Sequence, residues 1–260
     1  MRVLAFISAL WASPLAAHEF WISPVDAQVP PGAPLVADIR VGENFVGNAF
    51  SYVERNTTRY DLIWQGETVD PEATLGDRPI LNRVLPGEGL AIMVYESSNS
   101  GLTYDNWQKF VDFVEHKDLR GALERHAARG LPQTGFRETY RRYAKSLMAV
   151  GNGAGSDEVV GLATEIVALA NPYDPELGET LPVKVLLRGE PRVDVQVEIY
   201  ERNAAGDVSV STARTDGEGV ALIAVKPGHD YMLDSVYLTE RRNRTAWHSM
   251  WANLTFSVPG

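Results

Sequence analysis

The chain contains no cysteine among its 260 residues. Disulfide bonds, thiolate metal ligands and cysteine nucleophiles are therefore excluded. A secreted protein without disulfide bonds is more typical of a bacterial periplasm than of a eukaryotic extracellular space.

Basic residues are also scarce, because 24 Lys and Arg face 34 Asp and Glu and the formal net charge is −10. A surface of this sign repels the phosphate backbone of nucleic acids and attracts divalent cations weakly. We therefore expect no nucleic-acid partner.

The motifs that mark common enzymes are absent. No His-x-x-x-His or His-Glu-x-x-His pair provides a local zinc site, and no Gly-x-Ser-x-Gly provides a nucleophile elbow. The glycine-rich stretch at 151–156 lacks the Lys-Ser/Thr ending of a phosphate-binding loop. No spacing singles out a pair of carboxylates for acid–base work. The sequence therefore predicts a protein that is not an enzyme.

The apolar stretch at the start of the chain, Val3–Trp11, is too short to span a bilayer, which needs about 20 residues. It follows the basic start Met1-Arg2 and precedes the small-residue segment Ser13–Ala17. This order is typical of a secretory signal. We predict a signal peptide over residues 1–17, a periplasmic location, and no membrane span after processing.

Short apolar runs separated by Pro, Gly and Asp clusters predict strands at both ends of the chain. The cleanest alternation, Val193–Tyr200, has the period of a half-buried strand. The expected fold is mainly β, with a β-sandwich N-terminal region that carries a helical insertion, followed by an immunoglobulin-like β-sandwich. The predicted division is a signal peptide at 1–17, an N-terminal β domain at 18–103, a helical segment at 104–150, a linker at 151–159 and an immunoglobulin-like domain at 160–260.

Three helices are predicted within 104–150. Asp105 is the expected N-cap of the first and Asp118 that of the second. The third is expected over residues 136–150, because Phe136, Tyr140 and Leu147 recur at helical spacing.

His18 becomes the first residue of the mature protein if cleavage follows Ala17. A histidine at a free N-terminus offers its α-amine and its Nδ1, which together close one chelate ring on a metal ion. Both nitrogens readily lose a proton to a competing cation. We predict His18 as a metal ligand; the alternative is that processing leaves a histidine there by chance.

Two further histidines are candidate ligands. His229 follows a Lys-Pro-Gly turn, and His248 lies between Trp247 and Trp251, which would exclude water from a ligand. His116 is expected at a helix end, where an imidazolium interacts well with the helix dipole, and His126 on a solvent-facing side of its helix. The predicted metal ligands are therefore His18, His248 and His229.

Several segments together resemble one family, the bacterial periplasmic proteins associated with nickel and cobalt uptake that have long been catalogued as a domain of unknown function. The resemblance covers nearly the whole mature chain. The segments that carry it are His18–Trp21, Gly42–Gly47, Tyr140–Lys145, Glu165–Pro172, Thr215-Asp216 with Gly219, and Trp251–Phe256.

This resemblance implies an extracytoplasmic protein that captures or hands on Ni²⁺ or Co²⁺, with the mature N-terminal His18 as a ligand and a membrane metal transporter as a partner. Amine and imidazole donors suit Cu²⁺ and Zn²⁺ as well, so the donor types do not fix the metal. One alternative is a histidine-brace copper protein, either carrier or oxidative enzyme, in which His229 or His248 lies beside the His18 amine. A second is a metal-free sandwich that binds carbohydrate or protein.

Overall fold

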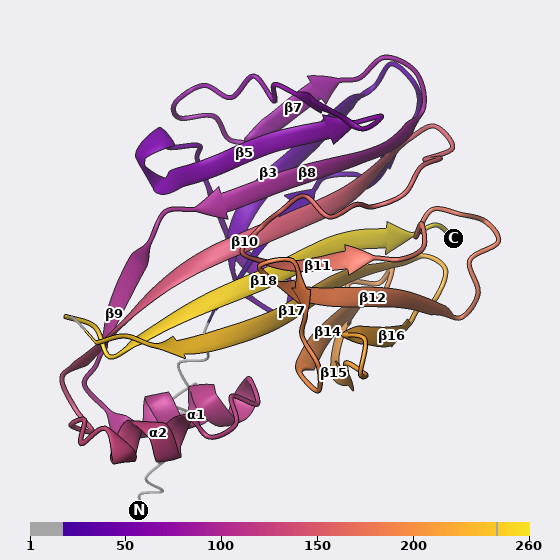
Figure 1. Ribbon diagram of the computed structural model, residues 1–260. Coiled ribbons are helices and arrows are strands. Elements are labelled where there is room, and N and C mark those ends of the chain that lie inside the picture. Colours follow the sequence, from indigo (N-terminus) through magenta and orange to yellow (C-terminus); the bar gives the residue numbers. More distant parts are fainter. Residues whose placement is uncertain (1–17, 243) are drawn as a thin grey trace, which may run out of the picture.

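The computed structural model describes residues 18–242 and 244–260, and the predicted signal peptide at 1–17 lies outside them. The protein is mainly β, with three sheets and a small helical insertion, which confirms the predicted sandwich architecture. The two helices lie at one end of the molecule, below β9 and the adjoining ends of β17 and β18 (Figure 1). None of the helices in the described ranges is long and apolar enough to cross a membrane.

Sheet A has four strands and contains the start of the described chain. Its order is β1-β3-β4. β1 and β4 pair with residues 37–43 of β3, whereas β7 pairs with residues 34–37 at its start. Its strands are β1 (Glu19–Pro24), β3 (Pro34–Glu43), β4 (Val46–Phe50) and β7 (Leu81–Val84).

Sheet B has ten strands and joins both halves of the chain. Its order is β15-β14-β17-β18-β10-β8-β5-β6, and β2 and β9 pair with β10. From the first half come β2 (Gln28–Val29), β5 (Thr57–Trp64), β6 (Glu67–Val69), β8 (Gly89–Ser97), β9 (Ser100–Tyr104) and β10 (Phe136–Val150). From the second half come β14 (Gln196–Arg202), β15 (Val208–Arg214), β17 (His229–Glu240) and β18 (Trp247–Val258).

Sheet C has four strands, with the order β11-β12-β13, and β16 pairs with β12. Its strands are β11 (Thr164–Ala168), β12 (Thr180–Leu187), β13 (Glu190–Pro191) and β16 (Val220–Ala224). A short 3₁₀ helix, η1 (Glu54–Asn56), precedes β5.

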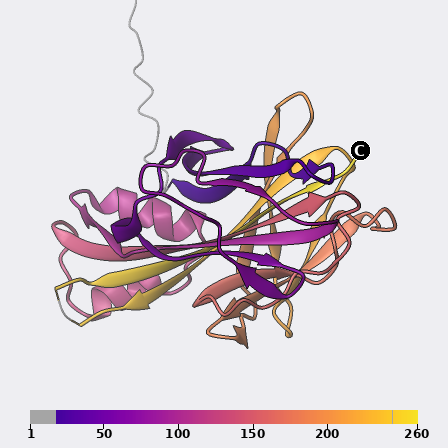
Figure 2. The ribbon, with the colours of Figure 1, turned by 90° about the horizontal axis from the view of Figure 1, so that it is seen from above.

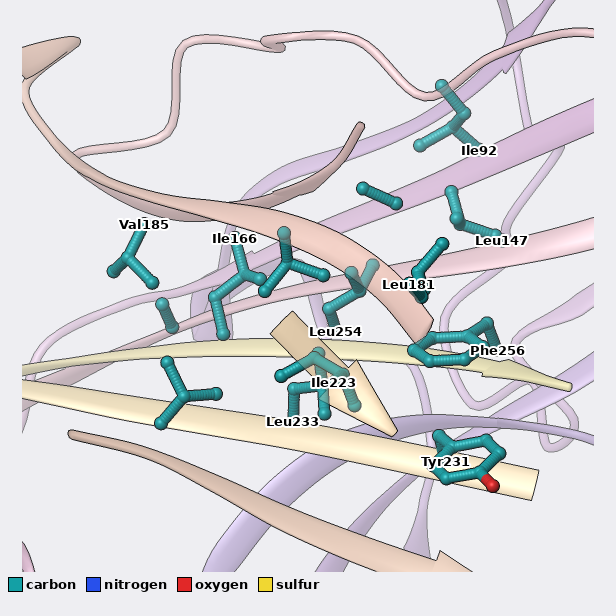
Figure 3. Close-up of a cluster of buried hydrophobic side chains, with 14 of the residues drawn as sticks. Ile92, Leu147, Ile166, Leu181, Val185, Ile223, Tyr231, Leu233, Leu254 and Phe256 are labelled. Carbon is teal, nitrogen blue, oxygen red and sulfur yellow. The ribbon is translucent and has the colours of Figure 1, made fainter. Parts of the chain in front are cut away.

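Sheet B is covered on both faces, and the alternation along its strands shows this directly. In β10, Leu147 belongs to the core shared with sheet C, whereas Met148 belongs to the core shared with sheet A. In β8, Ile92 belongs to the core shared with sheet C and Met93 to the core shared with sheet A. Figure 3 shows the core with sheet C, where Leu147 and Leu254 face Ile166 and Leu181. The strands of the two predicted sandwiches thus share one central sheet (Figure 2).

The helix predicted for residues 136–150 is wrong, because the whole segment forms strand β10. Its last eight residues, 143–150, are all buried. A strand that is covered on both faces lacks the period-two alternation of a half-buried strand, so its apolar residues are easily read at helical spacing.

The other two predicted helices exist, but their starts differ from the prediction. α1 (Trp107–His116) is capped by Asn106, whose side chain accepts a hydrogen bond from the Gln108 N–H at 2.8 Å. α2 (Ala122–Ala128) begins after Gly121, which has a φ of +72°. Both helices close a third core, in which Phe110 and Phe113 contact Trp247 and Trp251 of β18.

Candidate functional site

The three sequence-predicted ligands lie far apart. His18 directly precedes β1, is about half exposed, and places its Nε2 3.9 Å from Glu43 Oε1. His229 begins β17, and His248 pairs with Thr239 near the other end of the same strand.

Strand geometry shows that neither histidine reaches the start of β1. Glu19 and Asp234 both contact the ammonium of Lys117, at 3.4 and 3.0 Å, so β1 begins near the middle of β17. His229 and Thr239 are each five positions from Asp234 along β17, in opposite directions, which is about 17 Å at ~3.3 Å per residue. Two donors on one ion lie within about 5 Å of each other. His229 and His248 are therefore not co-ligands of His18, because the strand separates them.

Each of these two histidines has its own surroundings. His248 is buried, and its Nδ1 lies 3.0 Å from Thr139 Oγ1. Burial, together with the charge of Arg241, lowers the pKa of His248. His229 Nδ1 lies 3.4 Å from Glu201 Oε1.

A different cluster lies at the start of β1. Glu19 of β1, His116 at the end of α1 and Glu198 of β14 each offer a ligand atom, and these atoms all lie within 4.8 Å of one another. His116 Nε2 is 2.8 Å from Glu198 Oε1. His18 precedes Glu19 in the chain, so the only predicted ligand that adjoins this cluster is His18.

Lys117 lies beneath the cluster and is almost fully buried, with 4% of its surface exposed. Its ammonium forms ion pairs with Glu19, Glu198 and Asp234. The ring of Trp251 lies 5.0 Å from the ammonium. Three carboxylates against this ammonium leave an excess of negative charge in a poorly hydrated place, which Arg142 offsets in part through its interaction with Asp234 and Glu19.

Protonation offsets a further part of this excess in the metal-free protein. The hydrogen bond to Glu198 raises the pKa of His116, although burial opposes it. Burial raises the pKa of Asp234 to about 6, against the lowering effect of Lys117. For Glu198, burial is outweighed by the hydrogen bonds and charges of His116 and Lys117, so its pKa is lowered. Protons on His116 and Asp234 therefore neutralise charge that a metal ion would otherwise balance.

Several buried polar atoms next to the cluster make no hydrogen bond with the part of the chain that the structure describes. They are Asp234 Oδ1, both amide atoms of Asn253, and Trp21 Nε1. Asn253 pairs with Asp234 across β17 and β18, and all three residues are at most 3% exposed. Buried polar groups normally have partners, so this region can accept a further polar or ionic group.

The donors fit a divalent transition metal. An imidazole nitrogen and two carboxylate oxygens are ordinary ligands of Zn²⁺, Ni²⁺, Co²⁺ and Cu²⁺. Tyr200 donates its hydroxyl hydrogen to Glu19 Oε1 at 2.9 Å, which orients that carboxylate. His116 is half exposed at the rim, so the cluster is open to solvent on that side.

The sequence carries one signal for this cluster. Asp234 interrupts the apolar strand Tyr231–Leu238, and a charged residue within such a run requires a buried partner. His116 was expected at a helix end and does lie there, but its partner Glu198 comes from a distant strand.

The solvent-facing position predicted for His126 is wrong. His126 is 1% exposed, its Nε2 lies 3.0 Å from Pro132 O, and its Nδ1 accepts a hydrogen bond from Trp247 Nε1 at 3.1 Å. Burial lowers its pKa. His126 is therefore a core residue beneath the helices.

No curated protein has a significantly similar sequence. Among solved structures, a tetra-tandem repeat in the extending region of a large adhesion protein is 13% identical, with a TM-score of 0.21. The alignment covers 93% of this chain and 50% of that one, so this chain spans about half its length. Residues 15–239 match the sequence profile of the domain of unknown function DUF4198, and the chain belongs to this family.

Proposed function

We propose that the processed chain is a periplasmic, non-enzymatic binding protein for a divalent transition-metal ion, Ni²⁺ or Co²⁺, which it passes to a membrane metal transporter. The observation that carries the proposal is the cluster of Glu19, His116 and Glu198, whose ligand atoms lie within 4.8 Å of one another beside His18. Donors bonded to one ion at about 2.0–2.2 Å lie within about 4.4 Å, so small side-chain adjustments bring the three into range.

His18 completes this site in the proposal. Cleavage after Ala17 frees the α-amine of His18 one residue before Glu19, whose carboxylate already belongs to the cluster. The amine and the imidazole would add two nitrogen donors to one nitrogen and two oxygens. The excess negative charge of the cluster favours binding of a cation. The donor set alone does not select nickel or cobalt over copper or zinc, so selection would depend on geometry or supply.

The first prediction concerns His116. In protein that begins at His18, verified by mass spectrometry, His116→Ala should weaken binding by about 100-fold, since even residues that only orient a ligand affect metal affinity about 10- to 100-fold. Calorimetric titration with Ni²⁺, Co²⁺, Cu²⁺ and Zn²⁺ measures this effect. His229→Ala is the matched control and should bind as the unchanged protein does. This site would be disproved if the His116→Ala protein bound each of the four ions as tightly as the unchanged protein does. An extra Ala before His18 tests the role of the amine separately.

The second prediction concerns pH. Because Glu198 raises the pKa of His116, a metal ion must displace a proton there, and this proton alone lowers the affinity by up to about tenfold per pH unit below that pKa. Asp234 adds to this dependence below about pH 6. Titration in buffers of different ionisation enthalpy counts the protons released. A count that does not change with pH between 5 and 8 would contradict the assignment.

A further inference from the structure

A groove lies next to the start of β1, apart from the cluster of Glu19, His116 and Glu198. It lies between sheet A, the β8–β9 turn and β10, and its cavity is about 360 Å³. Small-molecule sites commonly have volumes of this order. The aromatic residues Phe20, Tyr95 and Tyr140 are among those that line it, together with Ser and Asn side chains such as Ser97 and Asn99. Arg142 is the one cationic residue among those that line it.

The guanidinium of Arg142 is held by aromatic rings. Its central carbon lies 4.2 Å from the ring centre of Trp251 and 5.2 Å from that of Tyr140. The backbone N–H of Arg142 donates to Ser97 Oγ at 3.0 Å, which fixes the strand at this point. Stacking on two rings restricts the planar side chain to one orientation, so little entropy is lost when it binds a ligand.

Arg142 has no acceptor for its guanidinium within residues 18–242 and 244–260, where its side chain forms neither a hydrogen bond nor an ion pair. The adjacent Arg141 differs, since it donates to Glu96 at 2.7 Å and to Asn99 at 3.1 Å. A guanidinium carries five N–H donors, and leaving them without acceptors in a half-buried place is costly. The nitrogens of the Arg142 guanidinium are not fully shielded from solvent, so an acceptor that enters the groove can reach them.

We propose that this groove binds a small organic monocarboxylate, which pairs its carboxylate with Arg142 and packs its body against Phe20, Tyr95 and Tyr140. A guanidinium matches a carboxylate through two parallel hydrogen bonds. One cation balances one negative charge, and the overall charge of −10 disfavours ligands of higher negative charge. Arg142 also interacts electrostatically with Asp234 and Glu19, so this groove adjoins the acidic cluster. The two proposals are tested separately, since the metal site is probed by metal titration of His116→Ala and the groove by carboxylate titration of Arg142 variants.

The test is calorimetric titration of the chain beginning at His18 with two probes, benzoate and galacturonate, and with their uncharged counterparts benzyl alcohol and galactose. At least one carboxylate should bind, and its counterpart should bind at least about tenfold more weakly. The difference between the probes tells whether the body of the ligand is an aromatic ring or a sugar.

Arg142→Gln should weaken binding of that probe by about 10- to 100-fold, which corresponds to the loss of a charge-assisted pair of hydrogen bonds. Arg142→Lys keeps the charge but not the planar fork, and an intermediate loss is expected. Arg137→Gln is the matched control, because Arg137 is exposed on the same strand and does not line the groove, and it should bind like the unchanged chain. If Arg142→Gln fails to fold in a thermal melt, Arg142→Lys decides. The proposal is overturned if neither carboxylate binds, or if the Arg142 variants bind the carboxylate as tightly as the unchanged chain does.

Discussion

Replacing Lys145 by methionine is expected to lower the free energy of unfolding by about 3–5 kcal/mol, the usual cost of removing one partner from a buried ion pair. Lys145 lies in β10 and is 1% exposed. Its ammonium contacts Asp157 at 2.7 Å and Glu165 at 3.0 Å, and donates to Glu158 O at 2.9 Å. The substitution leaves two buried carboxylates without a counter-charge.

The loss should extend to the segment that connects β10 to β11. Glu165 accepts hydrogen bonds from the backbone N–H groups of Val160, Gly161 and Leu162, and Asp157 accepts one from Ala168. These contacts attach residues 157–168 to sheet B through one ammonium. The segment predicted as a linker at 151–159 thus ends in a buried anchor.

Urea unfolding followed by circular dichroism measures the effect. The control is Lys109→Met, because Lys109 is exposed on α1, where a substitution usually changes stability by no more than about 0.5 kcal/mol. Adding Asp157→Asn and Glu165→Gln to Lys145→Met should restore part of the loss if unpaired charge is its cause. A loss below about 1 kcal/mol would show that the ammonium does not hold this region.

The second large effect is a change in the pH dependence of stability on replacing Glu138 by glutamine. Glu138 of β10 is 2% exposed and accepts hydrogen bonds from Tyr104 at 2.8 Å and from Ser249. Burial raises the pKa of Glu138 from 4.5 to about 7, although these two hydrogen bonds oppose the rise. The folded protein therefore keeps this side chain protonated at pH values where the unfolded chain ionises it.

The sign follows from proton linkage. Between pH 4.5 and about 7 the unfolded state binds fewer protons at this site than the folded state, so stability falls as pH rises. Above about pH 7 both states are ionised and the contribution is constant. A shift of this size corresponds to about 3 kcal/mol.

Glutamine resembles the protonated acid and does not titrate. Relative to the unchanged protein, Glu138→Gln should therefore be about 2.5 kcal/mol more stable at pH 8 than at pH 5, because part of the shift is already lost at pH 5. Urea unfolding at the two pH values measures this difference, and contributions from Asp234 cancel because both proteins contain it. Glu124→Gln on the exposed side of α2 is the control and should leave the pH profile unchanged. An identical pH profile for Glu138→Gln would contradict the assignment.

The two buried lysines differ in a way that bears on the proposed function. Lys145 pairs with two carboxylates that are at most 1% exposed, so no ion enters from solvent without disrupting the core. Lys117 pairs with three carboxylates, one of which also contacts the half-exposed His116. The first cluster is closed and structural, whereas the second has excess negative charge and an open side.

Sequence patterns predicted the strands well where buried and less buried residues alternate, as in β3 and β16, and where turns of Gly, Pro and Asp separate them. They failed at β10, because its apolar residues face sheet A and sheet C alternately and no alternation remains. The order of strands in sheet B was not accessible either, since β10 pairs in parallel with β18 across more than 100 residues.

The candidate site was only partly accessible for a similar reason. His18 was identified from the processing pattern, but its expected partners His229 and His248 were chosen from local neighbours. The residues that gather beside β1 are separated by 98 positions between Glu19 and Lys117 and by 81 between Lys117 and Glu198. Such distances in sequence are bridged by sheet topology, and a single sequence carries no signal for that pairing.

The position of β18 has a consequence for how the polypeptide acquires its structure. Trp247–Val258 are made after all the other strands of sheet B, yet they lie between β17 and β10 in the middle of that sheet. Until the ribosome has released them, two long strands lack a neighbour and the central layer remains open. Pairings this distant in sequence also slow folding, because the chain loses the entropy of closing a long loop before the stabilising contacts form. Nascent chains of this protein thus pass through a stage with unpaired strand edges, which are prone to intermolecular association.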